Sequence, residues 1–341
     1  MSAPLRIALL GTGNVGRALI DLVDARRDAG LALVHVANSR AEWRDPLALP
    51  AQVVVDATAS DEVAARHADW LARGVHVVTA NKLGQGASLA RWQAIDDACV
   101  TSGAQYGDSA TVGAGLPLLR SLRALRRGGD AIASIAGVLS GSMAWLLAHH
   151  DGARPFSQLV REARAAGYTE PDPRIDLRGE DVRRKLLILA RAAGVPLEAD
   201  EVRVEALSTP TLDAACTAGD IDAALASLDA PLQARLADLR DGERLHLVAR
   251  WSREQGASVA LETLAVHDPL AAGTGTDNRV AIRCARYATQ PLVIQGPGAG
   301  AGVTAAALLD DLLAIQVATG TARAASVSAN NASIGWGRLI A

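Results

Sequence analysis

The sequence predicts an α/β protein in which a Rossmann-type, doubly wound parallel sheet is joined to a second, α+β domain. Three observations support this prediction. An apolar strand pattern at residues 5–10 runs directly into Gly11-Thr12-Gly13-Asn14-Val15-Gly16, and a helical pattern follows at once. Apolar β-type runs alternate with helical stretches up to about residue 130. Beyond that point, β-type runs cluster near 245–295, which is typical of a separate, mostly antiparallel sheet.

The first domain is predicted element by element from this alternation. Its elements are a buried strand at 5–10, a helix at about 15–29, a second strand at 31–37 that completes a βαβ unit, and strands at 53–56 and 75–78, each followed by a helical stretch. We assign residues 1–130 to this domain and expect a C-terminal helix at about 303–320 to complete it.

The second domain is predicted over residues 131–302. It starts with a strand-like run at 131–139, continues with helical stretches at 142–150, 156–166, 180–194 and 211–240, and ends with β-type runs near 245–251, 258–265, 279–285 and 289–295. A glycine-rich loop at 296–302 then opens the helix at about 303–318. Residues 321–341 are rich in Ser, Ala and Asn and are expected to form a C-terminal tail.

The composition is typical of a globular protein. The 341 residues are 50% hydrophobic with a formal net charge of −3, which gives no electrostatic argument for binding nucleic acid or an anionic membrane. Cys99, Cys216 and Cys284 lie in helix-like or strand-like runs and are too few for a disulfide framework or a zinc site. No apolar run reaches the ~18 residues of a membrane span, and a first strand at Leu5 leaves no room for a signal peptide. We expect a cytoplasmic enzyme or binding protein.

The glycine-rich turn predicts a dinucleotide site. Gly11 permits a tight turn, Gly13 lets a pyrophosphate approach the backbone, and Gly16 lets the helix pack closely on the strand. An NAD site usually has Asp or Glu at the end of the second strand, where it binds the ribose. This chain instead has Asn38-Ser39-Arg40. Arg40 suits a 2′-phosphate, which favours NADP while leaving NAD possible, and a solvated loop cation is the alternative interpretation.

Lysine is almost absent from this chain. Of the 34 basic residues, only Lys82 and Lys185 are lysines. An ammonium group can release a proton near neutral pH in a suitable environment, whereas a guanidinium cannot. Both lysines are therefore candidates for proton transfer, and a solvated lysine without a function is the alternative.

Carboxylates surround Lys185 in the sequence. A proline-rich loop carries Glu170, Asp172 and Asp176 just ahead of the helix that contains Asp181 and Lys185. Asp181 and Lys185 are four residues apart and share a face of that helix, which is directly followed by an apolar run. Such a pair beside further carboxylates is suited to binding an amino acid and moving a proton. The alternative is a solvated helix pair that contributes only a few tenths of a kcal/mol.

Taken together, these segments resemble the homoserine dehydrogenase family over roughly residues 5–320. The matching segments are the Gly11–Gly16 turn, Asp56–Ser60, Val77–Lys82, Thr111–Pro117, Gly137–Ser142, Gly167–Lys185 and Gly298–Ala306. The chain looks most similar to the dehydrogenase portion of bifunctional aspartokinase enzymes, without a kinase or an ACT-type regulatory domain. From this we expect no allosteric inhibition by threonine.

The resemblance implies the reversible reaction of L-homoserine and NAD(P)+ to L-aspartate 4-semialdehyde and NAD(P)H, a step toward threonine, methionine and isoleucine. It implies that Lys185 is the acid–base residue, that Asp181 positions it, and that Lys82 lies between nicotinamide and substrate. The substrate-binding residues it implies are Glu170, Asp176, Tyr168, Gly141 and Ser142. A second Asp common in the family is Ile175 here.

The resemblance also implies ligand and partner sites. The cofactor-binding residues it implies are Gly11, Thr12, Gly13, Asn14, Val15, Gly16, Asn38, Ser39, Arg40, Thr58, Ser60, Thr79, Lys82 and Gly298. A monovalent cation, sodium in most members, would be held by the backbone carbonyls of Ser109, Val112, Ala114 and Leu116. A homodimer would form through the sheet of the second domain, which would also bind the substrate.

Two other functions compete with this interpretation. An aspartate-semialdehyde dehydrogenase would need a reactive cysteine at a helix start in a polar pocket, and the three cysteines do not fit that expectation. An NAD(P)-binding redox sensor without turnover would have no need of Lys185 and the acids around it. A turnover assay with homoserine and NADP+ separates the three.

Overall fold

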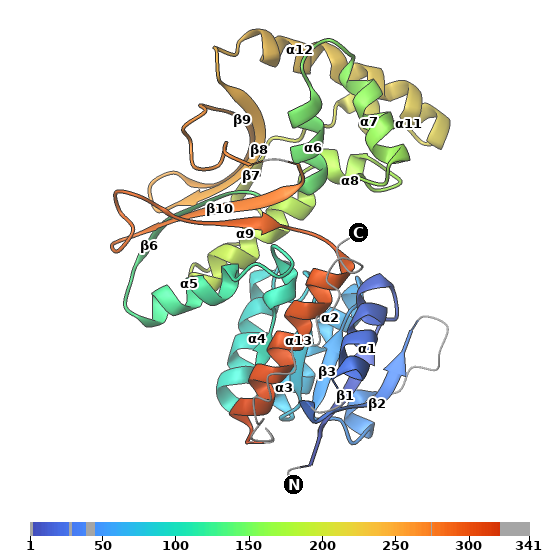
Figure 1. Cartoon of the computed structure of the whole chain (residues 1–341), viewed down its shortest axis with the longest axis vertical. Helices are drawn as coiled ribbons and strands as arrows, with labels where there is room; N and C mark the ends of the chain where they lie inside the picture. The colour runs from blue at the N-terminus through green and yellow to red at the C-terminus, as the bar shows by residue number, and fades with distance from the viewer. Residues whose placement is uncertain (1–2, 27–28, 39–44, 274, 321–341) are drawn as a thin grey trace. The chain divides into compact units, whose positions relative to one another are not determined.

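The computed structural model describes residues 3–26, 29–38, 45–273 and 275–320, which form two compact units (Figure 1). Of these residues, unit 1 contains those up to Leu119 and those from Ala299 to Gly320, and unit 2 contains those between Arg120 and Gly298. The break therefore lies earlier than the boundary expected near residue 130. Helix α5 (Leu118–Arg127) starts at the break, and most of it belongs to unit 2.

Unit 1 is built on a five-stranded parallel sheet. Its strands are β1 (Leu5–Leu10), β2 (Leu31–Ala37), β3 (Val53–Asp56), β4 (His76–Thr79) and β5 (Tyr106–Gly107), in the order β2-β1-β3-β4-β5. The strand order reverses between β1 and β3, so the loops after these two strands leave the sheet in opposite directions. In open parallel sheets, ligands bind at such a switch point, beside the carboxyl ends of the strands.

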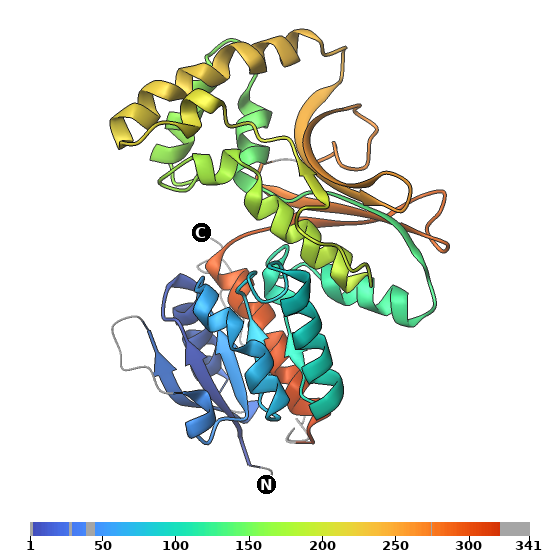
Figure 2. The same cartoon turned by 180° about the vertical axis from the view of Figure 1, so that it is seen from behind.

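Helices cover both faces of this sheet, as the two opposite views show (Figures 1 and 2). The helices are α1 (Asn14–Ala25), α2 (Asp61–Ala65), α3 (His67–Ala72), α4 (Leu89–Ser102) and α13 (Ala301–Ala318), with short 3₁₀ turns at Pro46–Ala48 and Ser109–Thr111. Alternate residues of β1 separate the two cores: Leu9 packs with α1 and α13, whereas Leu10 packs with α3 and α4. The predicted Rossmann-type fold class is confirmed.

Helix α13 is long and apolar enough to cross a membrane by length and mean hydropathy. Its apolar character has another explanation, because Leu308, Leu312 and Ile315 are buried in the core of unit 1. In the sequence, Asp310 and Asp311 interrupt the apolar run of this helix, so it was not predicted as a membrane span. The helix returns from the far end of the chain to complete the first domain, in the region where it was predicted.

Unit 2 contains a six-stranded sheet. Its strands are β6 (Ile132–Val138), β7 (Val202–Val204), β8 (Arg244–Ser252), β9 (Gly256–Leu264), β10 (Asp277–Cys284) and β11 (Leu292–Pro297), in the order β11-β10-β6-β8-β9-β7. All neighbours are antiparallel except β7 and β9, which are parallel. The mostly antiparallel second sheet was predicted, and the short strand β7 was not.

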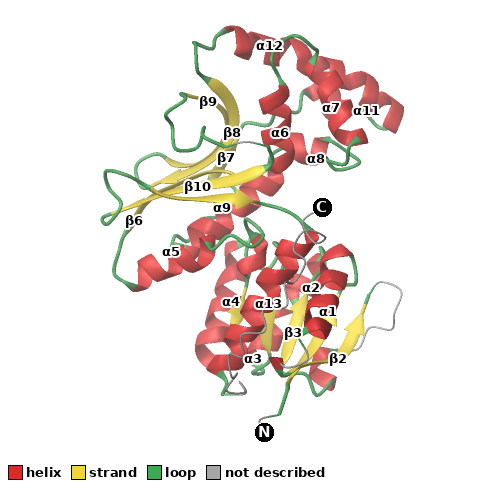
Figure 3. Ribbon diagram, viewed as in Figure 1, coloured by secondary structure: helices red, strands yellow, loops and turns green. Residues whose placement is uncertain are grey.

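Helices surround the sheet of unit 2 (Figure 3). Besides α5 they are α6 (Gly141–His149), α7 (Phe156–Ala165), α8 (Arg174–Leu177), α9 (Glu180–Ala192), α10 (Pro210–Asp213), α11 (Ala218–Ala224) and α12 (Asp229–Ala237), with a 3₁₀ turn at Leu225–Leu228. The run Leu186–Ala190 of α9 is completely buried. Lys185 therefore lies where α9 enters the core.

Several predicted boundaries were wrong. Helix α1 ends at Ala25, four residues before the predicted end at residue 29. The predicted helical region 211–240 is interrupted, because Thr217 caps the new helix α11 with its side chain and a reciprocal bond from Asp220. Cys216 consequently lies in an exposed loop and not in a regular element. Strand β11 continues to Pro297 and α13 begins at Ala301, so the glycine-rich loop is shorter than predicted.

Candidate active site

The glycine-rich turn has the geometry that a dinucleotide site requires. Gly11 has φ of +97°, and a side chain there would lie 2.8 Å from the carbonyl oxygen of Ala57. A Cβ at Gly16 would lie 2.0 Å from the carbonyl oxygen of Gly11, so helix and strand approach too closely for any other residue. A Cβ at Gly13 would meet no atom within 4 Å. Packing thus requires two of the glycines, while the third faces open space.

The N-terminus of α1 next to this turn can accept an anion. Gly13 is the N-cap residue, no side chain caps the helix, and its first turn contains no acidic residue. The amides at a helix N-terminus then remain available, and the helix dipole favours negative charge. The Asn38 side chain donates to Thr12 Oγ1 at 2.9 Å, which ties the end of β2 to the turn. Ser39 and Arg40 lie outside the described residues, so their predicted roles are not tested.

The loop after β3 is organised by a residue that the sequence analysis assigned no role, Asp56. Its carboxylate is fully buried, and Oδ1 accepts hydrogen bonds from the amide of Thr58 at 2.8 Å and from Thr58 Oγ1 at 2.6 Å. Thr58 Oγ1 in turn accepts the amide of Ser60 at 3.1 Å. The side chain of Thr79 is buried and donates to the carbonyl oxygen of Asp56 at 3.1 Å. Thr58 and Thr79 are therefore engaged in shaping the loops after β3 and β4.

The loop predicted to hold a cation by its carbonyls has an unusual backbone. Gly113 has φ of +74°, and Ala114 has φ of +50°, the one positive φ among the described residues other than glycine. Such a conformation costs energy and often marks a functional site. Ser109 is anchored from α13, because Asp311 accepts its amide at 2.9 Å and its hydroxyl at 2.7 Å. Leu116 O already accepts the amide of Leu118 at 2.8 Å.

In unit 2, Lys185 is held by two oxygens. Its Nζ donates to the carbonyl oxygen of Leu139 at 2.7 Å and lies 2.8 Å from Asp181 Oδ2. The lysine side chain is only 12% exposed, whereas that of Asp181 is 38% exposed. The pairing with Asp181 follows the predicted i,i+4 spacing. The contact with Leu139 brings the ammonium to the start of α6, because Ser140 is the N-cap of that helix.

Asp176 connects the proline-rich loop to α6. Its Oδ1 accepts the hydroxyl of Ser142 at 2.6 Å, and its Oδ2 accepts the amide of Glu170 at 2.9 Å. Ser142 Oγ also lies 2.9 Å from Ser140 Oγ, which caps α6 by accepting the amide of Met143. Both oxygens of Asp176 therefore already have protein partners, and its carboxylate holds the loop in place.

The remaining two carboxylates of this loop differ from each other. Asp172 is bound by the guanidinium of Arg174 at 2.7 Å, and hydrogen bonding to Arg174 holds the pKa of that carboxyl below its usual range. The side chain of Glu170 is exposed, and no bond to it is found among the described residues. Glu170 is thus the loop carboxylate with unused hydrogen-bonding capacity.

Tyr168 and Gly141 are also fixed by neighbours within unit 2. The ring of Tyr168 stacks on Trp145 with centroids 5.0 Å apart, and Trp145 stacks on His149 at 4.1 Å. A Cβ at Gly141 would lie 3.0 Å from the carbonyl oxygen of Thr276. Gly298, predicted to bind cofactor, has a packing requirement of its own, because a Cβ there would lie 2.0 Å from Asn278 Cγ.

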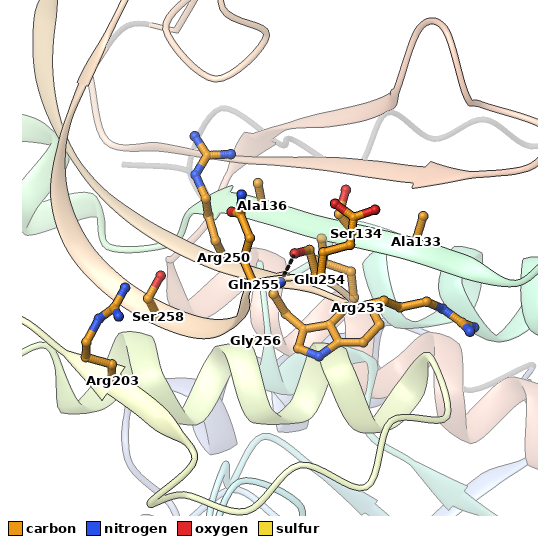
Figure 4. A pocket seen from close by; sticks show the side chains of 13 residues that line it. Ala133, Ser134, Ala136, Arg203, Arg250, Arg253, Glu254, Gln255, Gly256 and Ser258 are labelled. Carbon is orange, nitrogen blue, oxygen red and sulfur yellow. Dashed lines mark hydrogen bonds between the residues drawn. The ribbon is translucent and has the colours of Figure 1, made fainter.

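A cavity of about 410 Å³ in unit 2 is lined by residues of β6, β7, β8 and β9 (Figure 4). Arg203, Arg250 and Arg253 line it together with serines of β6, β8 and β9. Arg250 is paired with Glu262 at 2.7 Å, and the amide of Gln255 donates to Ser252 Oγ at 3.0 Å. The cavity contains none of the residues predicted for catalysis.

Within each unit the predicted residues are brought together. Unit 1 gathers the glycine turn with Asn38, and the loops of Thr58, Ser60, Thr79 and Lys82 follow neighbouring strands β3 and β4. Unit 2 gathers Lys185 and Asp181 at the start of α6, and Ser142, Asp176 and Glu170 beside Ser140. No role was predicted from the sequence for Asp56, Asn81 and Asp311, whose side chains bind to elements distant in sequence.

Comparisons with known proteins agree on one family. The family model described as "Homoserine dehydrogenase" matches residues 117–313, and the model described as "Homoserine dehydrogenase, NAD binding domain" matches residues 11–106. The chain is 37% identical to bifunctional aspartokinase/homoserine dehydrogenase 2 of Escherichia coli over 90% of its own length and 42% of that protein. It therefore spans about two-fifths of that bifunctional relative.

Two further relatives are covered almost completely. The chain is 30% identical to a homoserine dehydrogenase of Emericella nidulans, over 92% of this chain and 99% of that protein. The crystal structure of a Candida auris protein of unknown function superposes with a TM-score of 0.85 at 31% identity, covering 94% of this chain and 100% of the other. On the family models and these relatives, the chain belongs to the homoserine dehydrogenase family.

Proposed function

We propose that the protein is an NAD(P)-dependent oxidoreductase that interconverts L-homoserine and L-aspartate 4-semialdehyde. The observation that carries the proposal is the environment of Lys185. Its side chain is only 12% exposed, its ammonium is bound by Leu139 O and Asp181, and it lies at the start of α6 near the loop that carries Glu170. Membership in the family supports the choice of reaction. Lys185 in this cluster is a group that can transfer the proton that the reaction requires.

The chain's own residues would act as follows. Bound NAD(P)H supplies the hydride when the aldehyde is reduced. Two of the three ammonium donors of Lys185 are taken by Leu139 O and Asp181, so the third can donate a proton to the aldehyde oxygen. Asp181 keeps the lysine oriented. In the reverse direction, the neutral amine of Lys185 accepts the hydroxyl proton of homoserine and becomes the ammonium again, as general acid–base catalysis requires.

A direct test is NADP+-dependent oxidation of L-homoserine, followed through the absorbance of the reduced nicotinamide. We expect saturable turnover with homoserine and none with L-threonine or L-serine at the same concentrations. Binding of NADPH without turnover of homoserine would contradict the proposal and would favour a nucleotide-binding sensor. The same assay with phosphate and aspartate semialdehyde tests for an acylating dehydrogenase.

Glu170→Gln is expected to raise the KM for homoserine on the order of tenfold, with little change in kcat. Glu170 is the loop carboxylate without a protein partner among the described residues, and a carboxylate facing the substrate ammonium would bind ground and transition states alike. Steady-state kinetics at saturating NADP+ measure this effect. Glu162→Gln is the control, because Glu162 is an exposed carboxylate of the same unit paired with Arg154. An unchanged KM would place Glu170 outside the substrate site.

We propose NADP as the preferred cofactor, on the basis of the sequence Asn38-Ser39-Arg40 after β2. Arg40→Ala is then expected to weaken NADP+ binding roughly 10- to 100-fold, because one charge-assisted contact to phosphate is lost. NAD+ has no phosphate at that position and should bind almost equally to both proteins. Fluorescence titrations with NADPH and NADH measure the two affinities. Equal losses for both cofactors would show that Arg40 has no role in the choice.

We also propose that the carbonyls of Ser109, Val112, Ala114 and Leu116 bind a monovalent cation, most suitably sodium. The proposal is supported by the family resemblance and by the left-handed conformation of Ala114. Carbonyl oxygens are hard ligands that suit such ions. The cation would stabilise the loop that Asp311 anchors through Ser109.

We propose further that the protein acts in the cytoplasm as a homodimer, on the way to threonine, methionine and isoleucine. The resemblance places the second copy on the sheet of unit 2. The cavity on this sheet is lined by arginines and serines, and one of these arginines, Arg250, is paired with Glu262. A mixed polar face of this kind is typical of the rim of a protein interface.

A further inference from the structure

Asp56 is the centre of a buried hydrogen-bond network in unit 1. Besides the two bonds from Thr58 to Oδ1, its Oδ2 lies 3.0 Å from His67 Nε2 and accepts Asn81 Nδ2 at 3.0 Å. The other ring nitrogen of His67, Nδ1, lies 2.9 Å from the hydroxyl of Tyr106. Asp56 and His67 are both fully buried. An unpaired carboxylate is costly in such surroundings, and four hydrogen bonds compensate this one.

The network fixes the orientation of the His67 ring. When Nε2 donates to the carboxylate, Nδ1 of the neutral imidazole accepts the proton of the Tyr106 hydroxyl. The ring also packs beside Trp70 and Tyr106, with centroids 5.7 Å and 5.6 Å away. Asp56, His67 and Tyr106 come from β3, α3 and β5, so the chain of bonds runs from β3 past β4 to β5 at one edge of the sheet.

The same network holds the loop that carries Lys82. Asn81 Nδ2 donates to the carbonyl oxygen of Ser60 at 2.8 Å as well as to Asp56, and Asn81 Oδ1 accepts the amide of Leu83 at 3.0 Å. Both neighbours of Lys82 are therefore bound. Gly84 packs closely against His67 and Tyr106. A Cβ at this position would be 2.2 Å from the Tyr106 hydroxyl and 2.9 Å from His67 Nδ1.

We propose that His67 and Tyr106, together with Asp56, are positioning residues that set the backbone of Asn81–Gly84 and thereby place Lys82 for its role at the cofactor. This inference rests on the proposed function and on the family resemblance, which places Lys82 between nicotinamide and substrate. A misplacement of about 1 Å can reduce turnover on the order of 100-fold. A polar network whose members are all bonded specifies one arrangement of its loops. Apolar side chains of similar volume would stabilise the sheet equally well, but they would not direct bonds to the loops after β3 and β4.

The test compares the full-length wild type with His67→Phe, Tyr106→Phe and His67→Gln. Phe removes both ring nitrogens, whereas Gln keeps one donor for Asp56 and one acceptor for Tyr106. His76→Asn is the matched control: His76 Nδ1 accepts the amide of Gln105 at 2.9 Å, at the opposite end of the strand from Thr79. We measure kcat, KM for homoserine, the Kd of NADPH by fluorescence, and Tm. Kinetics are measured well below the lowest Tm.

We expect kcat to fall roughly 10- to 100-fold in His67→Phe and Tyr106→Phe, with weaker NADPH binding and a KM for homoserine within about twofold of wild type. His67→Gln should recover part of the loss, and His76→Asn should lose Tm without losing kcat. Unchanged kcat and Kd in both Phe variants would overturn the inference. The inference would also be overturned if the loss of kcat paralleled the loss of Tm in every variant, including His76→Asn.

The two proposals fail in distinguishable ways. A wild type that binds NADPH but does not oxidise homoserine contradicts the proposed function, while the NADPH affinities of His67→Phe, Tyr106→Phe and His76→Asn still test the positioning role. If His67→Phe does not fold, Tyr106→Phe decides the matter alone, because it removes a single hydroxyl and leaves the ring. NADPH binding by Tyr106→Phe equal to that of wild type, with equal kcat, then overturns the inference.

Discussion

Lys185→Arg is expected to bind NADPH as the wild type does and to lose roughly 10²–10⁴-fold in kcat, the contribution typical of general acid–base catalysis. The wild-type ammonium fits between Leu139 O at 2.7 Å and Asp181 Oδ2 at 2.8 Å, with only 12% of the side chain exposed. A guanidinium keeps the charge, but it is planar and larger, and it does not release a proton at working pH. The loss should therefore appear in the chemical step and not in cofactor binding.

Single-turnover rates with homoserine and NADP+, combined with NADPH titration, separate the two effects. Arg183→Lys is the matched control, because it makes the reverse exchange on the same helix at a residue paired with Glu180. That variant should retain kcat within about threefold, as expected for a partly exposed pair. Turnover of Lys185→Arg within a few-fold of the wild type would remove the lysine from the proton transfer.

Gly13→Ala and Gly16→Ala are expected to fail in different ways. Gly13 has φ of −69°, which alanine adopts without strain, and its Cβ would meet no protein atom within 4 Å. The variant should fold with an unchanged Tm yet bind NADPH roughly 10- to 100-fold more weakly, because the methyl group occupies the space of the pyrophosphate and overpacking is costly. In Gly16→Ala the Cβ would lie 2.0 Å from Gly11 O, so helix and strand must separate.

Gly16→Ala should therefore lose Tm as well as cofactor affinity. Thermal unfolding and NADPH titration of both variants measure the difference. Gly103→Ala is the control for a loss of Tm away from the turn, because Gly103 at the C-cap of α4 faces open space but has φ of +74°, which strains alanine; this variant should lose Tm and keep its affinity for NADPH. If Gly13→Ala bound NADPH as tightly as the wild type, the open space at Gly13 would have no role in binding the dinucleotide.

The sequence predicted best the parts of the molecule in which local pattern and burial agree. Strands β1, β2 and β3 were predicted at their observed ends, because each is a short apolar run bounded by turn residues. The predicted end of α1 and the predicted position of Cys216 in a regular element were wrong, because capping and packing decide where a helix ends. The pair Asp181 and Lys185 followed from helical spacing alone.

Contacts between distant segments were not predictable in the same way. Lys185 donates to Leu139, and Ser142 donates to Asp176, across gaps that no local pattern encodes. His67 meets Asp56 and Tyr106 only because β3, β4 and β5 are neighbours in the sheet. The sequence shows which residue types are present, and the strand order determines which of them meet.

The discontinuity of unit 1 has a consequence for biosynthesis. Its sheet is complete once Gly107 has been translated, but the apolar face shared by β1 and α1 is covered by Leu308, Leu312 and Ile315 of α13. At a translation rate of about 5–20 residues per second, the interval between synthesis of the sheet and synthesis of that helix is on the order of tens of seconds. Unit 2 is continuous in sequence and can fold meanwhile on the ribosome. The exposed face would then be a binding site for chaperones during translation, and ribosome profiling of chaperone-bound nascent chains should show engagement that ends after α13 emerges.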